Sequence, residues 1–172
     1  MNEITPKTSD ELLQFLTDLD IAHETHEHEA LMTVEQSQAL RGSIDGLHSK
    51  NLFLKNKKGA LWLVVAEESQ TIQLNTLRKH LQAGNWSFAS AELLMQHLGV
   101  EPGSVTPFGV INDLHHNVQV VLDQNMAEAE HVNFHPLINT RSTILSGADL
   151  LRFFDKTGHS PMILDFDAVN SA

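Results

Sequence analysis

The chain has 172 residues, 41% of them hydrophobic, with 11 Lys+Arg against 22 Asp+Glu and a formal net charge of −11. Because about 100–200 residues is the usual size of a domain, we expect one globular domain over residues 1–172. The absence of cysteine excludes disulfides, thiolate-bound zinc, iron–sulfur clusters and a cysteine nucleophile. The sequence shows no signal peptide, and no apolar run approaches the roughly 20 residues of a membrane span. We therefore expect a cytoplasmic protein without membrane contacts.

The first half of the chain predicts two helices and a β-hairpin. The capping-box pattern Thr8-x-x-Glu11 precedes apolar residues at helical spacing and predicts a first helix to about residue 19. A similar cap at Thr33 predicts a short helix through residue 40. Apolar runs at 51–54 and 60–66 flank a polar turn with a glycine, which predicts a hairpin whose second strand is largely buried.

The second half mixes helices and strands. It predicts helices at 74–81 and 91–98, strands at 118–122, 133–134 and 143–145, a helix between a Ser146 cap and Gly158, and a final strand at 162–166. There is no regular βαβ repeat, so the predicted fold class is α+β, a single compact domain with a mixed β-sheet flanked by helices.

The sequence favours neither a metal site nor a serine nucleophile. Eleven histidines suggest a metal site, and His26 and His28 could share one face of a strand, but no HExxH spacing or matching carboxylate accompanies them. Solvated loop and edge histidines are the simpler interpretation, so no metal and no cofactor is expected. A covalent serine mechanism is disfavoured because no G-x-S-x-G nucleophile elbow is present.

Two segments stand out as candidates for a binding site. Lys50 stands where a polar stretch enters an apolar strand, which would put its ammonium at the mouth of the strand; a simply solvated lysine is the alternative. Residues 99–109 contain two prolines and three glycines, so they predict a stiff loop whose backbone amides face a ligand oxygen. An ordinary helix-to-strand turn is the alternative for this loop.

Four segments in order extend these two candidates over nearly the whole chain: 28–35, 49–55, 98–113 with a G-x-x-x-P pattern from Gly103 to Pro107, and 132–139. Together they resemble the freestanding prolyl-tRNA editing family, the YbaK/ProX-like superfamily, and within it the alanyl-tRNA(Pro) deacylases called ProXp-ala or PrdX. Each piece alone is a weak signal, whereas four in order over a chain of suitable length are specific.

The resemblance implies a YbaK-like editing-domain fold and a trans-acting deacylase that hydrolyses mischarged Ala-tRNA(Pro) by a water-mediated, metal-independent mechanism. It implies that Lys50 meets the phosphate or ribose of the terminal adenosine and that His135 orients water or ribose; a structural histidine before Pro136 is the alternative. The substrate-binding residues it implies are Gly103, Ser104, Val105, Thr106, Pro107 and Asn51. As walls of a pocket that accepts alanine and excludes proline by size, we hypothesise Met32, Val34 and Leu47.

Alternatives to this function stay open at this point. Cys-tRNA(Pro) or another mischarged tRNA is an alternative substrate, because pocket size is not legible from sequence. A non-catalytic RNA- or protein-binding module on the same fold is the alternative from a different class, since one fold hosts many functions.

The charge is unevenly distributed along the chain. Residues 41–79 have a net charge of +4, whereas residues 1–40 have −8 and residues 80–172 have −7. A local basic patch can steer the acceptor end of tRNA(Pro), while the acidic remainder discourages non-specific nucleic-acid binding, so DNA is not an expected partner. Arg78 and Lys79, at the start or middle of a predicted helix, are predicted to face the RNA, with a solvated helix face as the alternative. Transient contact with prolyl-tRNA synthetase is a further expectation.

Overall fold

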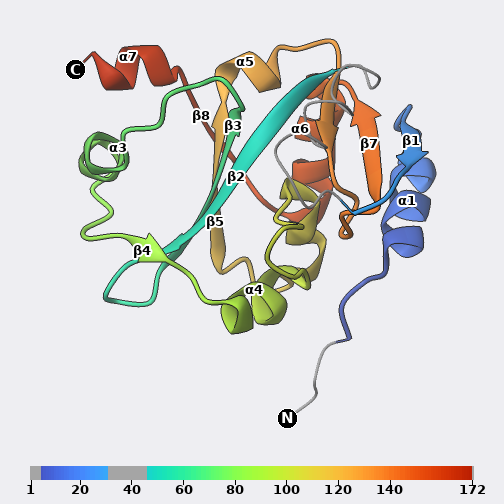
Figure 1. Ribbon diagram of the computed structural model, residues 1–172, viewed down its shortest axis with the longest axis horizontal. Coiled ribbons are helices and arrows are strands. Elements are labelled where there is room, and N and C mark those ends of the chain that lie inside the picture. Colours follow the sequence, from blue (N-terminus) through green and yellow to red (C-terminus); the bar gives the residue numbers. More distant parts are fainter. Residues whose placement is uncertain (1–4, 31–45, 172) are drawn as a thin grey trace.

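The long strand β2 (Leu47–Lys55) organises the sheet. Figure 1 shows the computed structural model, which describes residues 5–30 and 46–171. Within these residues eight strands form one sheet in the order β1-β7-β6-β2-β3-β5-β8, with β4 added beside β2. One edge of β2 pairs with β3, and its other edge pairs with β6 at Leu47 and His48 and with β4 at Leu54 and Lys55. The two ends of β2 therefore have different neighbours.

The sheet is mixed, because the pairs β2–β6, β3–β5 and β5–β8 are parallel and the others are antiparallel. The other strands are β1 (Glu24–Glu27), β3 (Leu61–Glu67), β4 (Ser87–Phe88), β5 (Val118–Asp123), β6 (Val132–Phe134), β7 (Arg141–Leu145) and β8 (Met162–Leu164). The helices are α1 (Ser9–Asp18), α3 (Leu74–His80), α4 (Ala91–Leu98), the 3-10 helix η1 (Pro107–Asn112), α5 (Gln124–Ala127), α6 (Gly147–Thr157) and α7 (Phe166–Asn170). The predicted α+β class is confirmed.

Strand β3 separates two apolar cores, because alternate side chains of a strand point to opposite faces. Its odd-numbered residues from 61 to 65 join the larger core with side chains of α1, α4, η1 and α6. Its even-numbered residues from 62 to 66 pack with Leu77 of α3 and Phe166 of α7. Figure 1 shows α3 and α7 together at one side of the sheet. Burial on both faces explains the continuous apolar run and confirms the predicted buried strand.

Local sequence signals fix several helix ends as predicted. The Thr8 hydroxyl accepts from the Glu11 amide at 3.2 Å, and the Glu11 carboxylate accepts from the Thr8 amide at 3.1 Å, which completes the capping box. Ser90 and Ser146 cap α4 and α6, and both helices end at a glycine in the left-handed region.

Other predicted elements change in the structure. The final strand ends at Leu164 instead of residue 166, because the Asp165 carboxylate accepts from two following amides and begins α7. Strand β2 begins at Leu47 instead of residue 51. The strands β1 and β4 and the helix α5 were not predicted, and the helix predicted over 33–40 lies outside the described residues. None of the helices in 5–30 and 46–171 is long and apolar enough to cross a membrane.

Candidate active site

Lys50 lies inside strand β2, where its backbone is level with Ala66 of β3. The prediction that it stands at the mouth of the strand is wrong, since β2 begins three residues earlier. The early start comes from pairing of Leu47 and His48 with β6 and of Ser49 and Lys50 with β3. Side chains alternate along a strand, so half-buried Lys50 shares a face with half-buried His48.

Strand β6 adds a second row of polar side chains to this face. His48 of β2 lies opposite Asn133 of β6 in the parallel pairing, which ends there. His135 follows one residue past the end of β6, close enough to His48 for a positive charge there to lower its pKa. The side-chain nitrogen of Asn133 is buried and has no hydrogen-bond partner among the described residues. We call the face that bears His48, Lys50, Asn133 and His135 the histidine face.

Two histidines are held in defined tautomers by backbone carbonyls. His135 Nδ1 lies 2.9 Å from the carbonyl oxygen of Arg141, and His28 Nδ1 lies 2.8 Å from that of Glu29. A carbonyl only accepts, so both rings donate from Nδ1. His28 Nε2 then accepts from the Ser142 hydroxyl at 2.8 Å. Within the described ranges no hydrogen bond reaches Nε2 of His135, which leaves a lone pair on this nitrogen.

Burial keeps His135 neutral. It lowers the pKa of His135 below the usual value for histidine, while the hydrogen bond to the Arg141 carbonyl acts in the opposite direction. Positive charge on His28 or His48 would lower the pKa further by repulsion. The ring centroids of His28 and His135 are 6.2 Å apart. At neutral pH, Nε2 of His135 can accept a proton or a hydrogen bond from water or a hydroxyl.

The loop from Gly103 to Pro107 lies near Asn139 in the β6–β7 connection. A side chain at Gly103 would begin 3.9 Å from the side-chain nitrogen Nδ2 of Asn139, and Gly103 itself has φ +91°. The Ser104 amide donates to the carbonyl of Glu101, at 3.0 Å, and is therefore already used in a turn. The Thr106 hydroxyl caps η1 by accepting from the amide of residue 108.

Hydrogen bonding within the loop leaves three of its amides without an acceptor in the described part of the chain, one of them on fully buried Thr106. Those of Gly103, Val105 and Thr106 have no acceptor among the residues that the structure describes. Backbone amides grouped on a short loop form a site for a negatively charged oxygen. Of the four backbone amides predicted to contact substrate, from 103 to 106, that of Ser104 already donates its hydrogen bond within its own turn.

Leu47 and Asn51 lie on the opposite face of β2 from Lys50, as the alternation of the strand requires. Leu47 is 36% exposed. Asn51 donates to the Ser49 hydroxyl at 3.0 Å, and its Oδ1 is buried without a partner in the described part of the chain. Among the predicted substrate contacts on this strand, Lys50 is the one that the structure brings to the histidine face.

The remaining predicted residues lie elsewhere. Arg78 and Lys79 are in the last turn of α3 rather than at its start or middle, where cations interact favourably with the helix dipole. Arg78 Nε donates to the side chain of Asn75 at 3.0 Å. The hypothesised pocket walls Met32 and Val34 lie outside the described residues.

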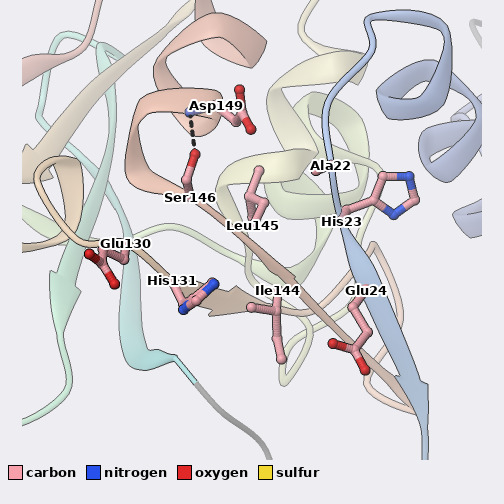
Figure 2. A pocket seen from close by; sticks show the side chains of 9 residues that line it. All are labelled: Ala22, His23, Glu24, Glu130, His131, Ile144, Leu145, Ser146 and Asp149. Carbon is pink, nitrogen blue, oxygen red and sulfur yellow. Dashed lines mark hydrogen bonds between the residues drawn. The ribbon is translucent and has the colours of Figure 1, made fainter.

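The hollows near the start of β2 and the end of β7 are acidic. A cavity of about 310 Å³ is lined by three carboxylates, those of Glu24, Glu130 and Asp149 (Figure 2). A wider depression of about 980 Å³ is also lined by three, those of Glu67, Glu128 and Glu130. Carboxylates repel phosphates, so neither hollow suits the backbone of a nucleic acid.

Sequence reasoning missed His48, Asn133 and Ser142 as members of the site. His48 and Asn133 each stand two residues before a predicted site residue, so the two-residue period of a strand was a usable signal. Ser142 enters through its bond with His28, 114 positions away, which no local pattern reveals. Among the described residues no group of three or more His, Asp or Glu side chains has an arrangement that could hold a metal ion.

Comparison with known proteins now identifies the family. The model of the aminoacyl-tRNA editing domain matches residues 28–153, a range that includes the histidine face and the 103–107 loop. The chain belongs to this family. Members are editing enzymes, and the chain is accordingly an aminoacyl-tRNA hydrolase that cleaves the ester of a mischarged tRNA. The resemblance found in the sequence is confirmed.

Relatives support the same editing-domain family. Prolyl-tRNA synthetase associated domain-containing protein 1 of Bos taurus is 40% identical over 161 residues, covering 91% of this chain and 94% of the relative. The Xenopus laevis protein of that name is 39% identical over 162 residues, covering 91% and 96%. The prolyl-tRNA editing protein ProX of Acetoanaerobium sticklandii is 35% identical over 146 residues, covering 84% and 89%.

Solved structures share the editing-domain fold. The hypothetical protein APE2540 superposes with a TM-score of 0.70 at 16% identity, covering 90% of this chain and 97% of the other. A candidate trans-editing enzyme for prolyl-tRNA synthetase superposes with a TM-score of 0.67 at 19% identity, covering 92% and 96%. The arrangement of strands around β2 is therefore one that other proteins have.

Proposed function

We propose that this editing enzyme hydrolyses mischarged Ala-tRNA(Pro) in trans, at the histidine face. The observation that supports this site is the neutral His135, whose Nε2 lone pair lies on the same face as Lys50, in a family that cleaves aminoacyl esters. The choice of tRNA(Pro) is supported by the names of the relatives, which refer to prolyl-tRNA editing and to prolyl-tRNA synthetase.

The proposed reaction is a direct hydrolysis. Water attacks the carbonyl carbon of the aminoacyl ester, the bond between that carbon and the ribose oxygen breaks, and the ribose oxygen takes up a proton. Nε2 of His135 accepts a hydrogen bond from the attacking water or from the ribose hydroxyl beside the ester. An aminoacyl ester is already activated, so positioning supplies much of the rate enhancement.

Two cationic or donor groups complete the proposed site. The free amides of Gly103, Val105 and Thr106 hold the oxygen that becomes negative as water adds, where preorganised donors are most effective. Lys50 binds the phosphate or the ribose of the terminal adenosine with its ammonium. Neither role requires a metal ion or an organic cofactor, so the proposal includes none.

The proposed specificity is for the smaller amino acid. A binding pocket that admits proline rejects alanine only weakly, since one or two missing methylenes are worth about 1–3 kcal/mol each. An editing site works in the other direction, by excluding the larger proline ring. Of the wall residues hypothesised from the sequence we propose Met32 and Val34, because Leu47 lies on the face of β2 opposite to Lys50.

The proposed partners follow from the substrate. They are the acceptor end of mischarged tRNA(Pro) and, transiently, the prolyl-tRNA synthetase that produces it. Arg78 and Lys79 contact the RNA, and the reaction takes place in the cytoplasm, where tRNA is charged.

A panel of charged tRNAs tests the proposal. Purified protein is incubated with tRNA(Pro) charged with alanine, serine, cysteine or proline, and release of the amino acid is followed under single-turnover conditions. We expect alanine to be released fastest and proline to stay attached. Faster release of cysteine or serine would overturn the alanine specificity, and release of proline would overturn the size-exclusion argument.

A further inference from the structure

The end of β2 remote from the histidine face has an aromatic pocket. This cavity of about 420 Å³ is lined by Leu54, Arg78, Trp86 and Phe88, among others. Phe88 is 63% exposed, more than any other large hydrophobic side chain among the described residues. The Trp86 ring lies 5.6 Å from that of Trp62 between centroids, and its buried indole nitrogen has no acceptor in the described part of the chain.

A basic cavity lies at the same end of β2, on the opposite face from this pocket, since Lys55 follows Leu54 along the strand. It measures about 570 Å³, lies at the β2–β3 turn, and its lining includes Lys55, Lys57 and Lys58. Strand β4 pairs with β2 at Leu54 and Lys55, so the two cavities flank one strand end. Within the described ranges, none of these lysines has a carboxylate oxygen within 4.0 Å, and neither does Arg78.

The two ends of β2 therefore differ in charge. No carboxylate lines the aromatic pocket or the basic cavity, all of whose lining residues are described. The cavity and the depression near the start of β2 have three carboxylates each. In a chain of net charge −11, a polyanion meets less repulsion in these two cavities than in the two acidic hollows.

The aromatic pocket and Lys50 are on the same face of β2. Leu54, which lines the pocket, stands four residues after Lys50. Side chains an even number of residues apart on a strand point to the same face of the sheet, so these two do. At about 3.3 Å per residue, the two positions are about 13 Å apart. At about 3.4 Å per stacked nucleotide, that distance spans about four nucleotides of a single strand.

We propose that the aromatic pocket binds a base of the acceptor strand a few nucleotides before the terminal adenosine. The base stacks on Phe88 beside Trp86 and Arg78, and the lysines of the basic cavity bind flanking phosphates. Sites for single-stranded nucleic acid combine these two features, aromatic platforms and a basic groove. The inference rests on the proposed function, because it takes the ester to lie near Lys50.

Two substrates of different length test this site. One is an alanylated RNA minihelix that reproduces the acceptor end of tRNA(Pro), and the other is 3′-O-alanyl-adenosine, which ends at the terminal nucleoside. Phe88→Ala should lower kcat/KM for the minihelix at least about fivefold more than for alanyl-adenosine, the smaller effect expected when one base no longer stacks on an aromatic ring. Met162→Ala, which truncates an exposed side chain on β8, is the control and should alter neither.

An equal effect of Phe88→Ala on both substrates, or none on either, would overturn the stacking site. A Lys57→Gln, Lys58→Gln double variant provides a second measurement at exposed positions. It should reduce the slope of log affinity for the uncharged minihelix against log salt by about 0.7 for each phosphate that the variant no longer neutralises. An unchanged slope would contradict the binding of phosphates by these lysines.

Failure of the proposed function gives a different result. If the wild-type protein hydrolyses neither ester, binding of the uncharged minihelix, followed by fluorescence anisotropy, decides the inference alone. Weaker binding by Phe88→Ala than by Met162→Ala then supports the site. Equal binding by the two variants excludes the site. The site is also excluded if the wild-type protein binds an acidic protein segment or anionic vesicles as tightly as it binds the minihelix.

Discussion

Replacing Asp113 by asparagine should destabilise the base of the 103–107 loop. Asp113 directly follows η1, and its side chain is 1% exposed. One carboxylate oxygen accepts from His159 Nε2 at 2.9 Å and from the Val118 amide at 2.8 Å, and the other accepts from the Asn117 amide at 3.0 Å. His159 is itself buried, with its side chain 3% exposed. The pair joins η1 to the segment after α6.

The size of the effect follows from this burial. Asparagine removes the charge and turns an NH2 group toward at least one donor, so a buried donor loses its acceptor. Breaking a buried pair by removing one partner costs about 3–5 kcal/mol. Since 1 kcal/mol shifts Tm by about 2–4 °C in a domain of this size, we expect Tm to fall by on the order of 10 °C.

The loss should depend on pH. Burial alone would raise the pKa of Asp113, but the hydrogen bonds from His159 and from the two amides outweigh it and hold the pKa below its usual value. A depressed pKa contributes stability above the unfolded value of about 3.9, and this is lost as pH falls through the folded pKa. The difference between wild type and Asp113→Asn should therefore shrink below about pH 4.

Thermal unfolding followed by circular dichroism, from about pH 3 to about pH 7, measures both effects. Asp155→Asn is the matched control, because Asp155 is exposed on α6 and should change Tm little at any pH. A Tm for Asp113→Asn equal to that of the control would refute the argument. So would a difference from wild type that stays constant down to the lowest pH.

Three further predictions concern single positions. The deacylation rate should stay constant at neutral pH and fall on the acid side with a midpoint below about 6.5, because only the neutral ring of His135 accepts a hydrogen bond; a higher midpoint would contradict this role. Gly103→Ala forces a side chain onto φ +91° at a cost of about 1–2 kcal/mol, so the loop should shift and kcat/KM fall roughly tenfold; full kcat/KM would contradict the assigned amides. Thr8→Ala should lower Tm by about 2–4 °C through loss of about 1 kcal/mol of capping, with deacylation unchanged; an unchanged Tm would contradict the capping box.

Local signals were sufficient for the elements that stabilise themselves. The capping box at Thr8, the serine caps of α4 and α6 and the hairpin turn before Ala60 each depend on residues within a few positions of one another. The strand β1, with sequence Glu-Thr-His-Glu, has no apolar alternation and forms because β7 supplies its hydrogen bonds. Such a strand can be predicted only when the strand that pairs with it is known.

The candidate site also combines features that local sequence predicts with features that depend on distant pairing. Lys50 stands out from its position beside an apolar run, whereas its role and the choice of His135 come from the resemblance to an editing family. The register of β2 against β6 sets His48 opposite Asn133, and alternation along β2 puts Lys50 on the same face; this pairing joins positions about 85 residues apart in the chain. The same pairing extends β2 back to Leu47, so Lys50 lies inside the strand. The apolar run alone begins after Lys50 and therefore predicts it at the entrance. Non-local pairing decided what local pattern left open.

The most direct test of the account is the rate at which Lys50→Ala deacylates Ala-tRNA(Pro), compared with wild type and with Lys156→Ala. Lys156 is exposed in the last turn of α6 and lies outside the proposed site. A hydrogen bond to a charged group is worth about 1.5–3 kcal/mol, so kcat/KM should fall by about tenfold to a hundredfold in Lys50→Ala. Lys156→Ala should match the wild type. Full activity of Lys50→Ala, at an unchanged Tm, would contradict the assignment of the histidine face as the site of ester cleavage.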